Sequence, residues 1–338
     1  ILKKLPLPDE EFVETWNSYF IESGANGVFK TLKKYLPQLN FPIEKGVSAL
    51  EEYRAAVLAE KPVTEISANA GLKIEAEDSI GLLIHKTPAG SIPVITVRNR
   101  NDFETLYRAL AFKNEPEPVP ASTGACAISG YNNCGRYIAY KNKCAAEDPF
   151  GLSFLENPAD QKSRYQDSFL LLGDGPYSGL APSCAGFGEA EWRDYSLKIR
   201  LGHESVHYFT KRCLGSMRNN AHDELLADYA GICGAFGEYD AELFFKFCGI
   251  ENFPEINPAG RINNYKGSPC LSDENFRAMC AFLYSAALNI ERFDKKHRKN
   301  FTRGDFTTAA VLCIASASID LIAAENGLSV LETALASV

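Results

Sequence analysis

The spacing of apolar residues changes along the first hundred residues from a helical period to shorter apolar runs. Residues 8–60 follow the helical period, and positions 8–11 hold proline and acidic residues, which suit the first turn of a helix. Two apolar runs, 82–85 and 92–97, flank the sequence Pro-Ala-Gly at 88–90. Because proline and glycine favour turns, this pattern predicts two strands joined by a turn.

A segment rich in turn-forming residues follows a short predicted helix. Asn101 can cap this helix, whose apolar positions continue to Leu110. Residues 114–135 then contain three prolines followed by Gly, Ser and Asn, a composition typical of a linker or a long functional loop. We therefore predict an N-terminal helical and β-hairpin region at 1–115 and a second region at 116–338, which could also form one compact unit with it.

The second predicted region begins with strands and then becomes helical. Residues 136–140 and 168–172 contain β-branched, aromatic and leucine residues bounded by Gly and Asp, which predicts two strands. From about residue 188 the pattern is helical, and apolar residues recur every three or four positions over 276–293, as in the buried stripe of a long helix. The expected fold class is α+β, with a mainly helical C-terminal half and a small mixed or antiparallel sheet upstream.

Length and composition indicate an ordinary globular protein with a large core. The chain has 338 residues, of which 46% are hydrophobic, and a chain of this length buries roughly three quarters of its unfolded surface. Such a chain needs no metal ion to stay folded, so a metal site would serve function. The longest apolar stretch, 309–324, is interrupted by Ser and Asp and is too short to span a bilayer, so no membrane partner is expected.

Charge and cysteine spacing argue against two further classes of protein. The formal net charge is −8 and Lys and Arg are scattered, which argues against nucleic acid as the main partner. The one basic cluster, 292–303, is expected to be a solvated helix end, with an anionic ligand site as the alternative. Ten cysteines occur without a CxxC pair and no signal segment is visible, so we expect free thiols and a cytoplasmic protein. Because the sequence lacks an initiating Met, an upstream piece could have been removed.

One segment carries a pattern suited to metal-ion chemistry, the run His203-Glu204-Ser205-Val206-His207. In a helix, His203 and His207 lie one turn apart on the same face, so both imidazoles can reach one ion at about 2.0–2.1 Å. Glu204 is rotated by about 100° from His203, close enough to contact a water on the ion without ligating it. This position suits a general base.

A second helical segment supplies carboxylates with the same spacing. Glu224 and Asp228 lie one turn apart and share a face. Catalytic zinc usually takes three protein ligands, and two histidines with a glutamate are an established set. The sixteen residues between His207 and Glu224 suffice for a helix end, a loop and re-entry into an antiparallel helix. We therefore expect one Zn²⁺ per chain, held by His203, His207 and Glu224.

Residues 203–230 resemble the gluzincin class of zinc peptidases, in which a His-Glu-x-x-His helix is followed by a glutamate ligand and, four residues later, an aspartate. The resemblance implies a zincin-like fold for the second region. It also implies that Glu204 activates water and that Asp228 hydrogen-bonds a ligand histidine. A carboxylate behind a ligating imidazole fixes its tautomer and raises its basicity. Gluzincins commonly hold an extended substrate against an edge strand, for which 168–172 is the nearest candidate, with a strand of the core as the equal alternative.

Two other ligands are weaker candidates. Cys213 stands where metzincins place a third histidine, but those proteins need glycine three residues after the second histidine, and this chain has Thr210. His222 would face away from Glu224 on a helix, although it could approach a substrate at a frayed helix end. The oxyanion of the reaction needs another donor. The sequence offers several candidates for the oxyanion or for substrate contacts, namely His222, Tyr208, Tyr229, Arg261, Tyr265 and Tyr284.

Two functions from different classes fit these features. The first is a zinc-dependent metallohydrolase, a peptidase acting on a peptide or protein substrate, with Glu204 as general base. The alternative is a catalytically inactive protein of zincin fold that retains the metal site and serves in binding or regulation, because fold alone does not guarantee activity. An open groove that reaches the ion would favour the enzyme, and a closed site would favour the binding protein.

Overall fold

The computed structural model describes residues 4–58, 71–147, 162–215, 221–301 and 303–337, and these form two compact units. One unit comprises Pro8–Asp174 and the other comprises Ile1–Leu7 with Gly175–Val338. The fold class is α+β, as predicted. The division between the units falls at residue 174, not at the predicted boundary after residue 115. The prediction was wrong because the residues after 115 supply two further strands to the same sheet as the first two.

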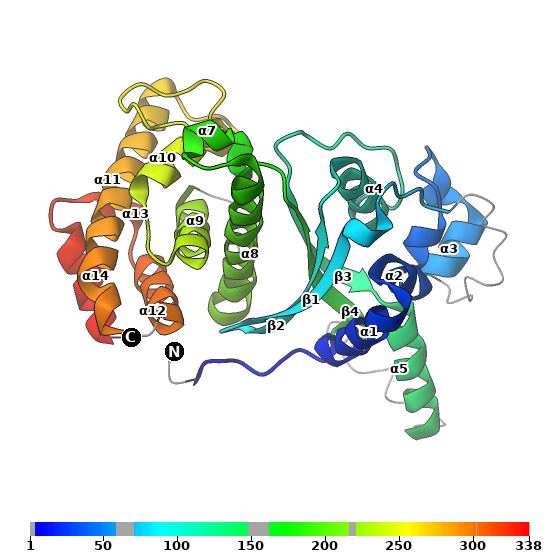
Figure 1. The fold of residues 1–338 in the computed structure, drawn as a ribbon. Helices are drawn as coiled ribbons and strands as arrows, with labels where there is room; N and C mark the ends of the chain where they lie inside the picture. Colours follow the sequence, from blue (N-terminus) through cyan, green and yellow to red (C-terminus); the bar gives the residue numbers. More distant parts are fainter. Residues whose placement is uncertain (1–3, 59–70, 148–161, 216–220, 302, 338) are drawn as a thin grey trace. The chain divides into compact units, whose positions relative to one another are not determined.

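The unit Pro8–Asp174 combines a four-stranded mixed sheet with helices (Figure 1). The strand order is β1-β2-β4-β3, in which only β2 and β4 are parallel. Its elements are α1 (Phe12–Asn26), α2 (Val28–Tyr35), η2 (Pro37–Asn40), η3 (Val47–Ala49), α3 (Glu51–Leu58), η5 (Glu77–Ser79), β1 (Ile80–Thr87), β2 (Gly90–Val97), α4 (Arg100–Ala111), β3 (Ala125–Asn132), α5 (Cys134–Glu147) and β4 (Gln166–Gly173).

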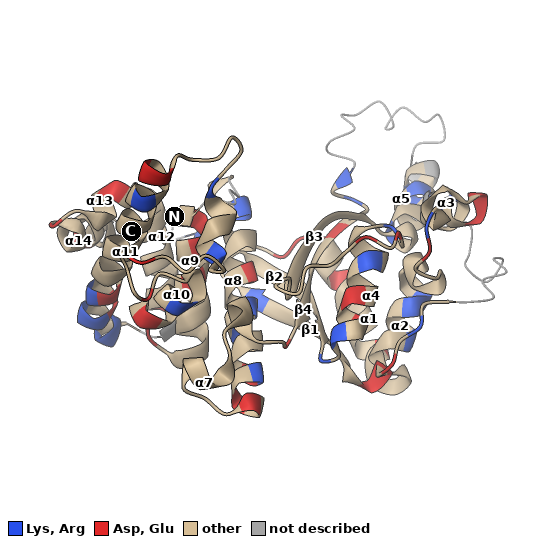
Figure 2. Ribbon diagram, turned by 90° about the horizontal axis from the view of Figure 1, so that it is seen from above, with Lys and Arg blue, Asp and Glu red and all other residues tan. Residues whose placement is uncertain are grey.

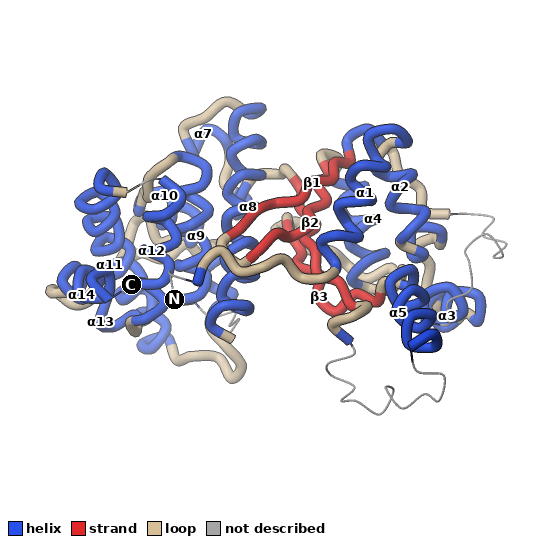
Figure 3. Tube along the Cα trace, turned by 90° about the horizontal axis from the view of Figure 1, so that it is seen from below, coloured by secondary structure: helices blue, strands red, loops and turns tan. Residues whose placement is uncertain are grey.

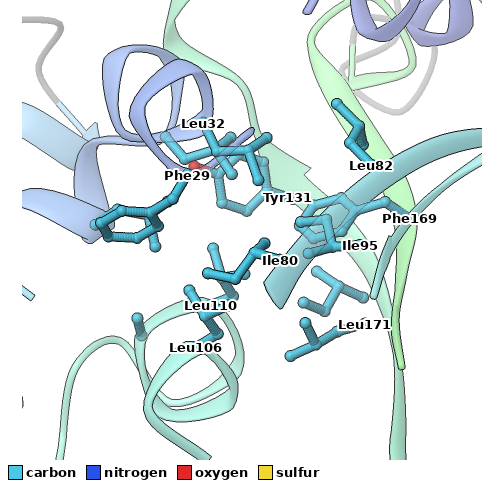
Figure 4. Packing of buried hydrophobic residues seen from close by; sticks show 14 of the residues in the cluster. Phe29, Leu32, Ile80, Leu82, Ile95, Leu106, Leu110, Tyr131, Phe169 and Leu171 are labelled. Atoms are coloured by element: carbon cyan, nitrogen blue, oxygen red, sulfur yellow. The ribbon is translucent and has the colours of Figure 1, made fainter. Parts of the chain in front are cut away.

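A hydrophobic core lies between one face of this sheet and helices α1, α2 and α4 (Figures 3 and 4). Strand residues that face it alternate along the chain, because successive side chains of a strand point to opposite faces. Ile80 and Leu82 come from β1, and Phe169 and Leu171 come from β4. The helices contribute residues such as Trp16, which is fully buried. The two strands predicted at 82–85 and 92–97 are confirmed as β1 and β2.

Two local predictions in this unit were wrong, and a third was decided between two alternatives. Residues 136–140 are helical, within α5, because the Asn133 side chain accepts a hydrogen bond from the Arg136 backbone at 3.1 Å and begins a helix. Helix α4 is capped by Asn99 and not by Asn101, since the Asn99 side chain accepts from the Asp102 backbone. The strand predicted at 168–172 is confirmed as β4, but β4 lies inside the sheet between β2 and β3. Of the two alternatives for this segment, the core strand is therefore confirmed and the edge strand is not.

The other unit is helical within the part of the chain that is described (Figure 1). The helical pattern predicted from about residue 188 onward is confirmed, and so is the buried stripe at 276–293. Its elements are η7 (Tyr177–Gly179), α7 (Pro182–Ala185), α8 (Glu189–Leu214), α9 (Ala221–Phe236), α10 (Ala241–Cys248), η8 (Arg261–Tyr265), α11 (Asp273–His297), η9 (Arg298–Asn300), α12 (Arg303–Ser316), α13 (Ile319–Ala323) and α14 (Gly327–Ser337).

Charged residues of both signs are interspersed along the helices (Figure 2). The basic residues at the end of α11 are paired with acids: Lys296 and His297 both contact Glu332, at 2.5 and 2.8 Å, and Lys295 contacts Glu291 at 2.9 Å. This pairing favours the predicted helix end over an anionic ligand site. Among the described residues, none of the helices is both long and apolar enough to cross a membrane.

All ten cysteines are free thiols in the structure. We expect thiol titration of the unfolded protein, carried out without reductant, to recover all ten. A parallel titration after reduction is the control for accidental oxidation. Recovery of two or fewer free thiols before reduction would contradict the prediction, because it would require several disulfides that the structure does not contain.

Candidate metal centre

Helices α8 and α9 pack so closely that two glycines are required where they meet. A Cβ atom added at Gly202 would lie 2.8 Å from the Cα of Gly231 and 3.0 Å from the carbonyl oxygen of Ala230. A Cβ atom added at Gly231 would lie 2.6 Å from the carbonyl oxygen of Ile199. Both contacts are with backbone, which cannot move aside cheaply. Because His203 directly follows Gly202, this close approach brings the histidine face of α8 against α9.

The three predicted ligands converge at this contact. The Nε2 atoms of His203 and His207 are 3.1 Å apart. Glu224 Oε2 lies 3.5 Å from His203 Nε2, and Glu224 Oε1 lies 3.6 Å from His207 Nε2. His203 and His207 are buried and Glu224 is half-buried. Each residue therefore offers one ligand atom to a common point.

The three residues lie close enough to hold one metal ion. Three atoms bound at 2.0–2.1 Å in a tetrahedral arrangement are about 3.4 Å from one another. One ligand atom from each of the three residues lies within 4.8 Å of the other two, so small side-chain movements would bring all three onto one ion. Among the residues that the structure describes, His203, His207 and Glu224 form the cluster of His, Cys or acidic side chains with this convergence. Two imidazoles and one carboxylate are a donor set that zinc uses in catalytic sites, where a fourth position takes water.

The electrostatic environment of the two histidines favours a bound cation. Burial lowers the pKa of His203, but the hydrogen bond and charge of Asp228, with the charges of Glu224 and Glu204, outweigh it and raise this pKa. Burial and the neighbouring His203 lower the pKa of His207 to about 3. His207 is therefore neutral near pH 7, with a lone pair for an ion. The acids that favour a proton on His203 also favour a metal cation in its place.

Asp228 occupies the position predicted for it behind His203. Its Oδ1 atom lies 2.9 Å from His203 Nδ1, the ring atom turned away from the ligand cluster. Asp228 is fully buried. Burial raises its pKa, but the charge of Arg261 and the hydrogen bond from His203 overcome this and lower the pKa to about 2. The carboxylate is thus ionised and can fix the orientation of the ring.

Glu204 lies beside the cluster and has a raised pKa. It is half-buried on α8 and does not belong to the ligand set. Burial raises its pKa, Glu224 raises it further, and the charges of His203 and Arg200 act in the opposite direction, with a net rise. A carboxylate with a raised pKa accepts a proton more readily near neutral pH, as a general base must.

Tyr177 is a residue of the site that the sequence did not indicate. Its hydroxyl donates to Asp228 Oδ1 at 2.6 Å and lies 2.9 Å from His203 Nδ1. Helix α8 fixes its position, since the backbone nitrogen of Tyr177 donates to Ser196 Oγ at 3.0 Å and the guanidinium of Arg200 lies over its ring. Tyr177 lies in a short turn without a motif, so no local pattern could have pointed to it.

Two of the candidates for the oxyanion lie at the site, in different roles. The Tyr265 hydroxyl donates to Glu224 Oε2 at 3.0 Å, so Tyr265 contacts a predicted ligand. Arg261 donates to Asp228 Oδ2 and, from its other terminal nitrogen, to the Tyr177 hydroxyl at 3.2 Å. Arg261 therefore lies behind His203.

Tyr229 does not reach the site, and its prediction as an oxyanion or substrate contact was wrong. Its side chain is fully buried and its hydroxyl donates to Asp294 on α11 at 2.7 Å. The remaining candidates make other contacts. Tyr208 accepts from Arg212, Tyr284 stacks on Phe245, and His222 is paired with the backbone of Ile314. Cys213 is not part of the ligand cluster.

Comparison with known proteins places the chain in a family without supplying an activity. The model of a family of unknown function, DUF7005, matches residues 2–326. Neither a curated protein nor a solved structure gives a match to this chain. The family match spans nearly the whole sequence, including both units and all residues of the candidate metal centre. The chain therefore belongs to the DUF7005 family.

Proposed function

We propose that this protein is a zinc-dependent hydrolase that cleaves peptide or amide bonds. The observation that carries the proposal is the convergence of His203, His207 and Glu224, which offer one ligand atom each within 4.8 Å of one another. This donor set is one that catalytic zinc uses. The motif-level resemblance of residues 203–230 to gluzincin peptidases supports the same conclusion, since it assigns these roles to the same residues. Glu204, next to the ligands, supplies the base.

Each residue of the site then has a chemical role. A zinc ion held by the three ligands would acidify a water molecule and polarise the carbonyl of the substrate. Glu204 accepts a proton from the attacking water and passes it to the leaving amine, a transfer that its raised pKa favours. Asp228 holds the ring of His203. Tyr265 is the candidate donor to the oxyanion, because its hydroxyl lies beside a ligand and burial raises its pKa, so that it keeps its proton.

The first test of this proposal is metal content. We expect the protein purified without chelator to contain about one zinc per chain, and the chelator-treated protein to take up one zinc again. The matched control is the His203→Ala/His207→Ala double variant, which lacks two of the three ligands and should take up none. Folded wild-type protein that stays metal-free when zinc is supplied would contradict the proposal.

A further inference from the structure

Arg261, Tyr177 and Asp228 form a largely buried hydrogen-bonded group behind His203. Arg261 donates to Asp228 Oδ2 and to the hydroxyl of Tyr177, and that hydroxyl lies 2.6 Å from Asp228 Oδ1. The same Oδ1 atom lies 2.9 Å from His203 Nδ1. Tyr177 and Asp228 are both buried. The four side chains are therefore linked through Asp228 and Tyr177; Tyr177, Asp228 and His203 are buried and Arg261 is half-buried.

The direction of every hydrogen bond in this group follows from what each side chain can donate. A guanidinium has only donors and a carboxylate only acceptors. Tyr177 accepts from Arg261 and has a single proton to donate, either to Asp228 Oδ1 at 2.6 Å or to His203 Nδ1 at 2.9 Å. The ionised Asp228 cannot donate, so the proton of its contact with His203 belongs to Nδ1. A protonated Nδ1 cannot accept, so the Tyr177 proton points to Asp228 Oδ1. In the neutral ring the Nε2 atom of His203 is then left with a free lone pair, directed at His207 and Glu224.

We propose that Tyr177 and Arg261 are positioning residues of the metal centre, which act through Asp228 on the tautomer and orientation of His203. The inference rests on the proposed metal site. Arg261 balances the charge of Asp228, and Tyr177 fixes the carboxylate oxygen that His203 contacts. Without them, Asp228 could rotate or accept from other donors. His203 would then lose the constraint that presents Nε2 to a cation.

Close backbone packing and side-chain hydrogen bonds to the backbone fix the segment that carries Arg261. Gly249 has a left-handed φ of 78°, and a Cβ atom there would lie 2.6 Å from the Cα of Gly260. The Asn263 side chain donates to three backbone carbonyls of residues 257–260, at 2.9–3.3 Å. The same short helix, η8, supplies Tyr265 to Glu224 at its other end. This one segment therefore contacts both Asp228, the partner of the predicted ligand His203, and the predicted ligand Glu224.

The chain contains a matched group that touches no predicted ligand. Tyr229 donates to the buried Asp294 at 2.7 Å and accepts from Arg298 at 3.2 Å. The corresponding distances for Tyr177 are 2.6 Å to Asp228 and 3.2 Å from Arg261. Replacing Tyr229 by Phe therefore removes the same kind of buried hydroxyl as replacing Tyr177. It leaves the surroundings of the ligands intact, which makes it the control.

The experiment compares Tyr177→Phe with Tyr229→Phe. Zinc affinity is measured by competition with a chromophoric chelator, and the visible absorption of the cobalt(II)-substituted protein reports the coordination geometry. Thermal unfolding of the metal-free proteins measures the structural effect alone. We expect Tyr177→Phe to bind zinc about 10-fold more weakly, within the range for outer partners of ligand histidines, and to change the cobalt spectrum. Tyr229→Phe should lose comparable thermal stability while keeping wild-type zinc affinity and the wild-type spectrum.

Further variants keep the test decisive if one protein folds poorly. Arg261→Lys keeps the charge but not the two-pronged contact, and it should also weaken zinc binding. If Tyr177 acts through Asp228, the Tyr177→Phe/Asp228→Asn double variant should bind zinc no more weakly than Asp228→Asn alone. Wild-type zinc affinity and cobalt spectrum in both Tyr177→Phe and Arg261→Lys would overturn this inference alone. A wild-type protein that takes up neither ion would overturn the proposed function together with it.

Discussion

Replacement of Glu204 by Gln is expected to leave zinc bound and to reduce hydrolysis by about 100-fold or more, the scale of a general base. Glutamine has nearly the same shape as glutamate, and Glu204 is not part of the ligand cluster. The substitution therefore removes the proton acceptor while the three ligands stay in place. Zinc content is measured by elemental analysis. Hydrolysis is measured on a substrate identified by digesting a peptide library with the wild-type protein.

The control for this prediction is Glu224→Ala, which removes a charged ligand and should weaken zinc binding by orders of magnitude. Asp228→Asn should lie between the two, with about a 10- to 100-fold loss of affinity or activity. If Glu204→Gln lost zinc as completely as Glu224→Ala, the assignment of base and ligand would be wrong. Zinc-loaded wild-type protein that cleaves no peptide would favour the inactive, zinc-retaining alternative.

Substitution of Gly202 by Ala is expected to destabilise the fold and weaken zinc binding, although alanine is the better helix former. The added Cβ would lie 2.8 Å from the backbone of Gly231, so α8 and α9 must move apart. Overpacking of this kind costs about 1–3 kcal/mol. The histidines are on α8 and the carboxylates on α9, so the same movement separates the ligands. We expect at least about a 10-fold loss of zinc affinity.

Gly234→Ala provides the matched control on α9. A Cβ atom at Gly234 would have no neighbouring heavy atom within 4 Å outside the backbone of its own helix, so the substitution only improves helix propensity, by up to about 1 kcal/mol. Gly234→Ala should therefore raise the midpoint temperature of thermal unfolding, whereas Gly202→Ala should lower it. Thermal unfolding of the metal-free proteins and chelator competition measure the two effects. Equal stabilisation by both substitutions would show that the close contact of α8 and α9 does not constrain the fold.

Local sequence was sufficient to predict those features that depend on a single helix or hairpin. His203 and His207 are four residues apart, so they share one face of their helix. Glu224 and Asp228 share a face of theirs for the same reason, because the geometry of an α-helix is fixed. The hairpin of β1 and β2 was predicted for a similar reason, since its turn chemistry lies within a few residues. The α+β class and the helical C-terminal half followed from the same local periods.

Short segments were predicted wrongly where a distant partner decides the outcome. Residues 136–140 have strand-like composition, but Arg136 is buried and paired with Asp167 of β4, and Asn133 begins a helix there. β4 was predicted as a strand, but its position inside the sheet depends on β2 and β3. The division after residue 174 could not be predicted for the same reason. Strands far apart in the chain pair with one another, and this pairing holds the unit Pro8–Asp174 together.

The sequence by itself determined which side chains could bind an ion, because helical spacing fixes which residues share a face. Only the tertiary structure decided that the two faces meet. That meeting depends on Gly202 and Gly231, whose lack of a Cβ lets the backbones of α8 and α9 approach. The tertiary structure also decided that Tyr177 and Arg261 contact Asp228, which is 51 and 33 residues away from them along the chain. Hydrogen bonds between such distant segments form only when the packed helices bring them together, so no local pattern encodes them.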